Sequence, residues 1–243
     1  MPRPRLRDNQ GREPFELYPL GEVPATVLIS IGKQMTYRYL VGQADISGGD
    51  WGNIFSTAIS GEHLGAPFGL ADVIYENMAW SVKSVKHNNP HRARVVRIIS
   101  GRCSPDYSYG ITNVRADIHR TGAAVLGIYN ERVSLAKDKY EPLRISVIVR
   151  NINKLEFTLF ELEIVRYSIQ DYEWRLNKKN NLEGIDKISG THKFTWQPHG
   201  AQLTIKYDIP ASAQRFSVKR PPVLDFNETL SKIGFDDSWV TIL

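Results

Sequence analysis

Two short segments decide the fold: Gly69-Leu-Ala-Asp-Val-Ile-Tyr75 and Ala79-Trp-Ser-Val-Lys-Ser-Val85. Both are rich in β-branched and aromatic residues, which favours strands, and residues 76–78 between them form a plausible turn. The two segments therefore predict a β-hairpin. In such a hairpin Asp72 on the first strand lies close enough to Lys83 on the second for their side chains to converge.

Outward from the hairpin, the sequence alternates between helical and strand patterns. Residues 51–64 and 116–139 carry apolar side chains at helical spacing, while residues 25–31 fit either a strand or a buried helix segment. Residues 144–150 are apolar almost throughout, as in a central strand covered on both faces, and 156–165 is expected to pair with them. This order predicts an α/β fold, with α+β as the alternative, built on a mixed central sheet flanked by helices.

Changes in composition divide the chain into three parts. Residues 1–20 are rich in Pro, Arg and Gly and are interpreted as a basic N-terminal arm. Residues 21–167 form the predicted core, and residues 168–243 form a β-rich C-terminal extension for DNA recognition or dimerisation. Strand-like pieces at 193–196 and 202–207 support the β-rich character of that extension.

Composition narrows the class of function. The 243 residues carry a formal net charge of +5, which favours polyanionic partners such as nucleic acid. With Cys103 as its single cysteine the chain can form no intrachain disulfide, so a reducing cytoplasmic setting fits best. No apolar run approaches 18 residues, and the basic N-terminus lacks an apolar signal region, so neither a membrane span nor secretion is expected.

The hairpin carries residue types suited to phosphodiester hydrolysis. That reaction needs a cation to polarise the phosphate and activate water, and magnesium prefers hard oxygen ligands such as the Asp72 carboxylate. A nearby lysine, here Lys83, can stabilise negative charge or position the nucleophile. Because alternate residues on a strand share one face, Ser81 points the same way as Lys83 and Val82 points into the core.

At these positions the sequence resembles the PD-(D/E)XK nuclease superfamily, best known from type II restriction endonucleases. Asp72 matches the first acidic residue of the family pattern and Lys83 its lysine, whereas Ser81 replaces the second acidic residue. Glu62, at the end of the preceding predicted helix, matches a glutamate that approaches the site in such enzymes. The resemblance implies a Mg²⁺ site in which either Glu62 compensates for Ser81, or Asp72, the Val82 carbonyl and water hold the cation.

The resemblance extends over roughly 115 residues, because the helix at 116–139 and the two following strands occur in the family's order. It implies a magnesium-dependent endonuclease that cuts double-stranded DNA at specific sites, as type II restriction enzymes do. It also implies a homodimer, since a palindromic site matches a two-fold protein.

Candidate DNA contacts come from three stretches of the chain. The basic run after the hairpin is suited to phosphates, whereas polar residues on the 116–139 helix and near the 196–200 turn are suited to base edges. The candidates are Lys86, Arg92, Arg94, Arg97, Arg102, Asn130, Arg132, Gln197, His199 and Gln202.

Other interpretations stay open. The hairpin can be purely structural in a non-catalytic nucleic-acid-binding protein, or the chain can be a nuclease-fold enzyme of DNA repair or one that acts on RNA. Ser104-Pro-Asp106 contains a literal Pro-Asp, and Glu161 and Glu163 share a strand face, so each offers a weaker metal site. The histidine spacings do not indicate zinc, and neither a P-loop nor a hydrolase elbow occurs.

Overall fold

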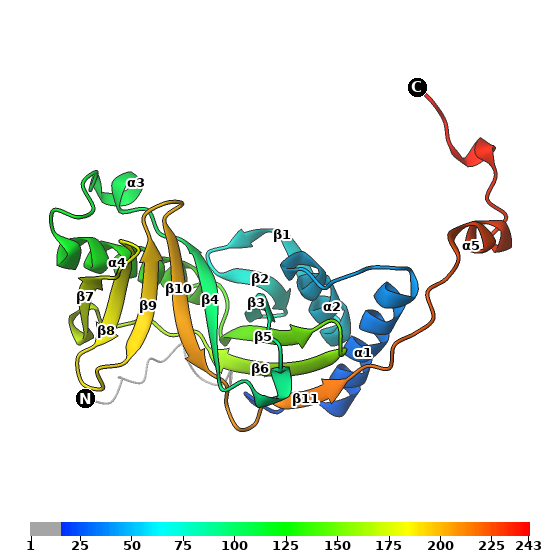
Figure 1. Ribbon diagram of the computed structural model, residues 1–243, viewed down its shortest axis with the longest axis horizontal. Helices are drawn as coiled ribbons and strands as arrows, with labels where there is room; N and C mark the ends of the chain where they lie inside the picture. The colour runs from blue at the N-terminus through cyan, green and yellow to red at the C-terminus, as the bar shows by residue number, and fades with distance from the viewer. Residues whose placement is uncertain (1–15) are drawn as a thin grey trace, which may run out of the picture.

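A computed structural model describes residues 16–243, apart from the side chains of residues 66 and 67, and it contains two β-sheets with helices packed around them (Figure 1). The first sheet has the strand order β1 (Glu62–Phe68), β2 (Ala71–Tyr75), β3 (Met78–Lys86), β5 (Leu143–Asn151), β6 (Glu156–Glu163) and β11 (Gln214–Ser217). The second has the order β4 (Val95–Arg102), β10 (Gln202–Asp208), β9 (His192–Gln197), β8 (Leu182–Asp186) and β7 (Tyr172–Leu176). The helices are α1 (Ala25–Leu40), α2 (Gly48–Ile59), α3 (Pro105–Tyr109), α4 (Ile118–Lys137) and α5 (Phe226–Lys232).

The predicted hairpin forms, and it belongs to a larger antiparallel unit. β1, β2 and β3 follow one another in the chain and pair antiparallel. β3 then pairs parallel with β5, in a ladder that runs from Ala79 opposite Leu143 to Lys86 opposite Arg150. Parallel neighbours need a long crossover, and here the crossover contains β4 and α4. The coarse prediction of a mixed α/β protein is confirmed.

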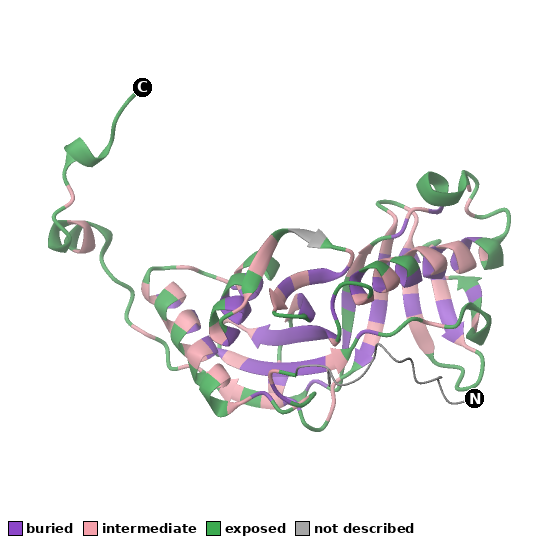
Figure 2. Cartoon of the chain, turned by 180° about the vertical axis from the view of Figure 1, so that it is seen from behind, coloured by how far each residue is buried: buried purple, intermediate pink, exposed green. Residues whose placement is uncertain are grey.

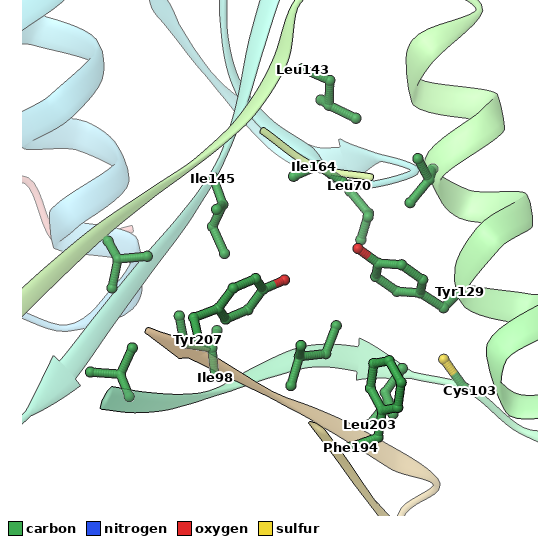
Figure 3. Packing of buried hydrophobic residues seen from close by; sticks show 14 of the residues in the cluster. Leu70, Ile98, Cys103, Tyr129, Leu143, Ile145, Ile164, Phe194, Leu203 and Tyr207 are labelled. Carbon is green, nitrogen blue, oxygen red and sulfur yellow. The ribbon is translucent and has the colours of Figure 1, made fainter. Parts of the chain in front are cut away.

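Apolar clusters cover both faces of the first sheet. Because side chains alternate along a strand, β3 sends Trp80 and Val82 to one face and Ala79 to the other. The first face packs against α1 and α2, and we call this cluster the α1–α2 core. The second face packs against α4 and the second sheet, in an inter-sheet core that joins Leu143 of β5 to Tyr129 of α4 (Figure 3).

The helices α1 and α2 differ in their agreement with the sequence. Residues 25–31 belong to a helix rather than a strand, because Ile31, Met35 and Tyr39 follow at helical spacing and are buried in the α1–α2 core. The helix predicted over 51–64 ends at Ile59, so that part of the prediction was wrong. Ser60 caps it in the left-handed region at φ 58°, and Glu62 begins a strand instead of ending a helix.

The chain passes between the two sheets more than once. β4, from the predicted core, is an edge strand of the second sheet, and β11, from the predicted extension, pairs with β6 in the first. Residue 168 therefore marks no boundary between the sheets. Within residues 16–243, no helix is both long enough and apolar enough to cross a membrane.

The predicted N-terminal arm lies mostly outside the described residues, since the structure begins at Glu16. Its last part is anchored rather than free. The Tyr18 hydroxyl donates to Glu161 Oε1 at 2.9 Å, and the Arg144 guanidinium donates to the Tyr18 carbonyl at 3.0 Å. Arg144 and Glu161 form a buried ion pair at 3.3 Å. Burial raises the pKa of the Glu161 carboxyl, and the Arg144 charge opposes that shift.

Replacing Glu161 with alanine is expected to lower the free energy of unfolding by roughly 3–5 kcal/mol, because Arg144 then loses its buried partner and keeps only Glu16, which is 44% exposed, at 3.4 Å. Urea denaturation followed by circular dichroism measures the loss. Glu163→Ala is the matched control, since Glu163 is more than half exposed where it pairs with Lys137, and it should lose less than about 1 kcal/mol. Equal losses in the two variants would contradict the anchoring role of the buried pair.

Candidate active site and nucleic-acid surface

Three consecutive residues of the hairpin donate to a single carboxylate oxygen. Asp72 Oδ2 accepts hydrogen bonds from Ser81 Oγ at 3.1 Å, from the Val82 backbone N–H at 3.0 Å and from Lys83 Nζ at 3.1 Å. The residues that the sequence singled out on two strands are therefore in direct contact. They lie on β2 and β3, the strands labelled in Figure 1, where the antiparallel part of the first sheet meets its parallel part.

The contact forms because the β2–β3 ladder stops early. Its last residue pair is Val73 with Trp80, so the Val82 N–H lies beyond the ladder. The Asp72 carboxylate accepts this N–H in place of a backbone carbonyl. A turn at Gly69 leads into β2 with φ +60°, where a Cβ would lie 2.7 Å from the Arg132 carbonyl oxygen. Glycine is therefore required at the point where α4 packs against the turn.

Two oxygen atoms at this edge, Asp72 Oδ1 and the Val82 carbonyl oxygen, are candidate ligands for a cation. In a strand the N–H and C=O of one residue point to the same edge, so the Val82 carbonyl faces the side on which Asp72 lies. All three side-chain or backbone donors to Asp72 in the described chain reach Oδ2 rather than Oδ1. The Asp72 and Lys83 side chains are 21% and 22% exposed, so solvent or a ligand can reach them.

This donor set fits one kind of magnesium site. Among residues 16–243 no group of three or more His, Cys, Asp or Glu side chains is placed to hold a metal ion. Magnesium, however, is commonly bound by one or two carboxylates together with substrate phosphates and water, without a complete protein cage. Asp72 and the Val82 carbonyl fit that arrangement, in which the substrate supplies further oxygens.

Glu62 lies on the same strand face as Asp72, although not on the predicted helix. It is exposed, and its Cα partner on β2 is Ile74. Ile74 and Asp72 share a face because they are two residues apart, so Glu62 is the diagonal neighbour of Asp72 at about 7–8 Å between Cα atoms. This is within reach of a long side chain, and it keeps Glu62 as an accessory ligand in the proposal.

The structure gives two predicted DNA contacts structural roles. Asn130 is buried, its Nδ2 donates to the Tyr167 carbonyl at 2.7 Å, and its Oδ1 accepts from the Tyr167 N–H at 2.8 Å. Its amide therefore offers no free edge to a base. Arg132 donates to the carbonyls of Gly69 at 3.1 Å and Ser100 at 3.5 Å, so it ties α4 to the turn before β2 and to β4.

Three other predicted contacts form a row across the second sheet. Arg102 of β4 is the Cα partner of Gln202 on β10, which is the partner of Gln197 on β9. Side chains along β10 alternate between the inner and the outer face of the sheet. Leu203 is therefore buried, and Gln202 is partly exposed on the outer face. His199 is exposed in the turn that joins the two strands.

The outer face of the second sheet also contains basic residues that the sequence analysis missed. Arg97 of β4 is the Cα partner of Lys206, and it lines a polar cavity of about 420 Å³. Lys178, Lys179 and Gln197 line the same cavity. The alternation Gln-Leu-Thr-Ile-Lys-Tyr over 202–207 was the signal for Lys206, because it places every second residue on the exposed face.

The remaining basic candidates lie apart from this row. Arg92 and Arg94 are exposed on the 3₁₀ turn Pro90–Arg92 and just before β4. Lys86 is 74% exposed at the end of β3, where it pairs with Asp45 at 2.8 Å. Hydrogen bonds from the Arg150 guanidinium hold the pKa of Asp45 well below its usual range, so this carboxylate stays charged beside Lys86.

The edge contact predicts different stability losses for its two partners. Lys83→Ala should change the free energy of unfolding by less than about 1 kcal/mol, because the ion pair is partly exposed. Asp72→Ala should lose roughly 1–3 kcal/mol, because the Val82 N–H and Ser81 then lose their acceptor. Urea denaturation of both variants measures the difference, and an Asp72→Ala loss no larger than that of Lys83→Ala would contradict this role of the carboxylate.

Comparison with known proteins gives no match: no protein-family model, no curated protein and no solved structure matches this chain. The candidate site is therefore interpreted from the geometry of its own residues and from the local sequence pattern.

Proposed function

We propose that the chain is a magnesium-dependent endonuclease that cuts double-stranded DNA at specific sites in the cytoplasm. The observation that carries the proposal is the convergence of Ser81, the Val82 backbone and Lys83 on the Asp72 carboxylate at an open strand edge. A carboxylate, a free carbonyl and an ammonium group within one hairpin are the groups that phosphodiester hydrolysis uses.

Each residue has a distinct role in the proposal. Asp72 and the Val82 carbonyl hold the cation, with Glu62 as an accessory ligand. When bound, Mg²⁺ would polarise the phosphate and lower the pKa of a bound water. Lys83 turns from Asp72 to the phosphate or the nucleophile, and Ser81 orients the carboxylate through its 3.1 Å hydrogen bond.

The order of elements supports this proposal. A helix, three antiparallel strands, a long helix and a strand parallel to the third occur in this order as α2, β1–β3, α4 and β5, with β4 and α3 between β3 and α4. This order resembles that of PD-(D/E)XK nucleases. The resemblance concerns only the order of the helices and strands, and the support for hydrolysis comes from the residues of the site.

The second sheet supports DNA as the substrate. Its outer face carries Arg97, Arg102 and Lys206 beside the amides of Gln197 and Gln202. Cationic side chains bind phosphates without regard to sequence, whereas amides and arginines can read base edges in the major groove. We propose that this face contacts duplex DNA, and that a homodimer recognises a two-fold site. A role in restriction defence is an analogy at the level of the fold.

A non-catalytic nucleic-acid-binding protein is the second candidate. One observation favours it: Asp72 already accepts three hydrogen bonds, as expected of a carboxylate that only completes a strand edge. The two candidates agree on the binding surface and differ in the effect of magnesium. A nuclease-fold repair enzyme or one that acts on RNA differs in substrate, and competition between duplex DNA, single strands and RNA separates it.

Incubation of the protein with large unmethylated DNA should give discrete fragments with Mg²⁺ and none with EDTA. Asp72→Asn and Lys83→Ala should each reduce the cleavage rate by at least about 100-fold, because the first removes the charged ligand of the cation and the second removes a positive charge that stabilises the transition state. Glu163→Ala, which changes an exposed carboxylate on β6, should cut at the wild-type rate.

Two results would contradict the proposed nuclease activity. One is binding without cleavage across several DNAs, and the other is cleavage that persists unchanged in Asp72→Asn. A smear in place of discrete fragments would retain the hydrolysis and reject the site specificity.

The outer face of the second sheet makes a separate prediction. Arg102→Ala should weaken DNA binding and make the plot of log Kobs against log salt less steep by about 0.9, the value for one lost phosphate contact. Fluorescence anisotropy at several salt concentrations, with EDTA present, measures the slope. Lys154→Ala, an exposed change in the β5–β6 turn, is the control, and an equal change in both variants would exclude Arg102 from the contact surface.

A further inference from the structure

The end of the chain leaves the body and exposes apolar side chains. Residues 221–243, which we call the C-terminal arm, project away from both sheets (Figures 1 and 2). In the described chain no residue beyond Ala213 is buried. The large exposed apolar side chains of the arm include Val223, Phe226, Ile233, Trp239, Val240, Ile242 and Leu243. α5 has only seven residues, fewer than the roughly 12–15 that an isolated helix needs in water, so the arm requires a partner surface.

A groove lies beside the point where the arm leaves. It has a volume of about 510 Å³ and is bounded by α1 on one side and by the segment after β11 on the other. We call it the α1 groove, and its lining residues are Gly32, Lys33, Thr36, Tyr37, Leu40, Ser217, Val218 and Lys219. Ile29 and Tyr37 of the same helix, and Val41 just after it, are each more than half exposed. This outer face of α1 therefore carries apolar side chains that no other segment of the described chain covers.

Gly32 leaves this face of α1 open to a closely packed segment. It lies in the middle of α1, where glycine is less favourable than alanine by roughly 0.5–1 kcal/mol. A Cβ built there meets no atom within 4 Å, so packing within this chain does not require glycine. A second backbone or a large side chain can lie close against the helix here only because glycine has no Cβ.

The charges of the arm and of the groove are complementary. From Asp225 to Leu243 the arm carries four carboxylates, Asp225, Glu228, Asp236 and Asp237, against the single lysine Lys232. The walls of the groove carry exposed Lys33 and Lys219. Hydrogen bonds from Ser238 hold the pKa of Asp236 below its ordinary value, so that carboxylate stays charged. The same acidic arm is poorly suited to bind DNA.

The path of the chain directs the arm away from its own groove. Arg220 is held by the carbonyls of Ile152 and Asn153, and the Leu224 N–H donates to the Leu40 carbonyl at 2.9 Å. Between them Pro221 and Pro222 form a stiff, extended link. The arm thus starts at the C-terminal end of α1 and continues outward (Figure 1). The groove runs back along the helix, from Leu40 to Gly32.

We infer that the C-terminal arm of one copy occupies the α1 groove of a second copy, and that the exchange is reciprocal about a two-fold axis. Phe226 and Trp239 are the two aromatic anchors of the arm, and an aromatic side chain buries roughly 150–250 Å². Two exchanged arms therefore approach the interface of about 800 Å² per partner that specific association needs. This inference rests on the arm and the groove and does not depend on nuclease activity.

Complementation between two defective chains tests the exchange. One variant ends at Arg220 and lacks the arm, and the other carries Gly32→Trp and has a blocked groove. Sedimentation velocity should show a wild-type dimer, and each variant alone should dissociate at concentrations roughly 30-fold or more above the wild type. An equimolar mixture should associate more tightly than either variant alone but less tightly than the wild type, because one chain supplies a groove, the other supplies an arm, and only one of the two contacts forms.

Gly48→Trp is the matched control, since Gly48 begins α2 and a Cβ there also meets no atom within 4 Å. It should dimerise as the wild type does, and circular dichroism should show all variants folded. The double change Lys33→Glu and Lys219→Glu should weaken the dimer about tenfold, and Asp236→Lys with Asp237→Lys in the same chain should restore it. A monomeric wild type, a dimer that persists without the arm, or a mixture that associates no more tightly than the separate variants would each overturn the exchange.

Discussion

The parallel pairing of β3 with β5 is the constraint on which the rest of the structure depends. Both strands are central in the first sheet, and eight of the nine residues of β5 are buried. A sheet covered on both faces needs two separate apolar layers. α1 and α2 supply one layer, and α4 with the second sheet supplies the other. The crossover that makes the pairing parallel also delivers β4 to the second sheet, so one connection builds both layers.

The candidate site is a consequence of how this sheet ends. Beyond Trp80 the outer edge of β3 has no backbone partner from β2, and an open edge invites pairing with another strand. The Asp72 carboxylate satisfies the Val82 N–H and also presents a negative charge. The edge is thereby closed to a strand but open to a cation or a hydrogen-bond donor. Structural and chemical uses of Asp72 are compatible, because they use different atoms of the same hairpin.

Much of the fold followed from short-range patterns. The hairpin at 69–85, the helix near 116–139 and the strand at 144–150 were predicted because period and burial agree in those segments. The Asp72–Lys83 contact followed from the predicted hairpin, which brings the two strands side by side. The sequence of residues 25–31 does not distinguish a helix from a strand, because several of these residues are β-branched. The buried positions Met35 and Tyr39, which make α1 helical, follow that segment.

What failed depended on contacts distant in sequence. Glu62 was placed on a helix because nothing near it revealed that Ser60 adopts a left-handed cap. Asn130 was interpreted as a base contact, and only the position of Tyr167, 37 residues away, shows that its amide is used within the fold. The partnership of β4 with β10, more than 100 residues apart, has no local signal at all.

That partnership also bears on how the molecule can change. The chain leaves the first sheet after β3 and after β6, and it returns at β5 and at β11. No single cut therefore separates a complete sheet from the other, and a fragment that begins after residue 168 lacks β4, an edge strand of the second sheet. The parts of the chain before and after residue 168 therefore cannot be exchanged between proteins as independent folding units. New surface properties on the second sheet must arise by substitution and by change in its loops, within a framework that both sheets hold in common.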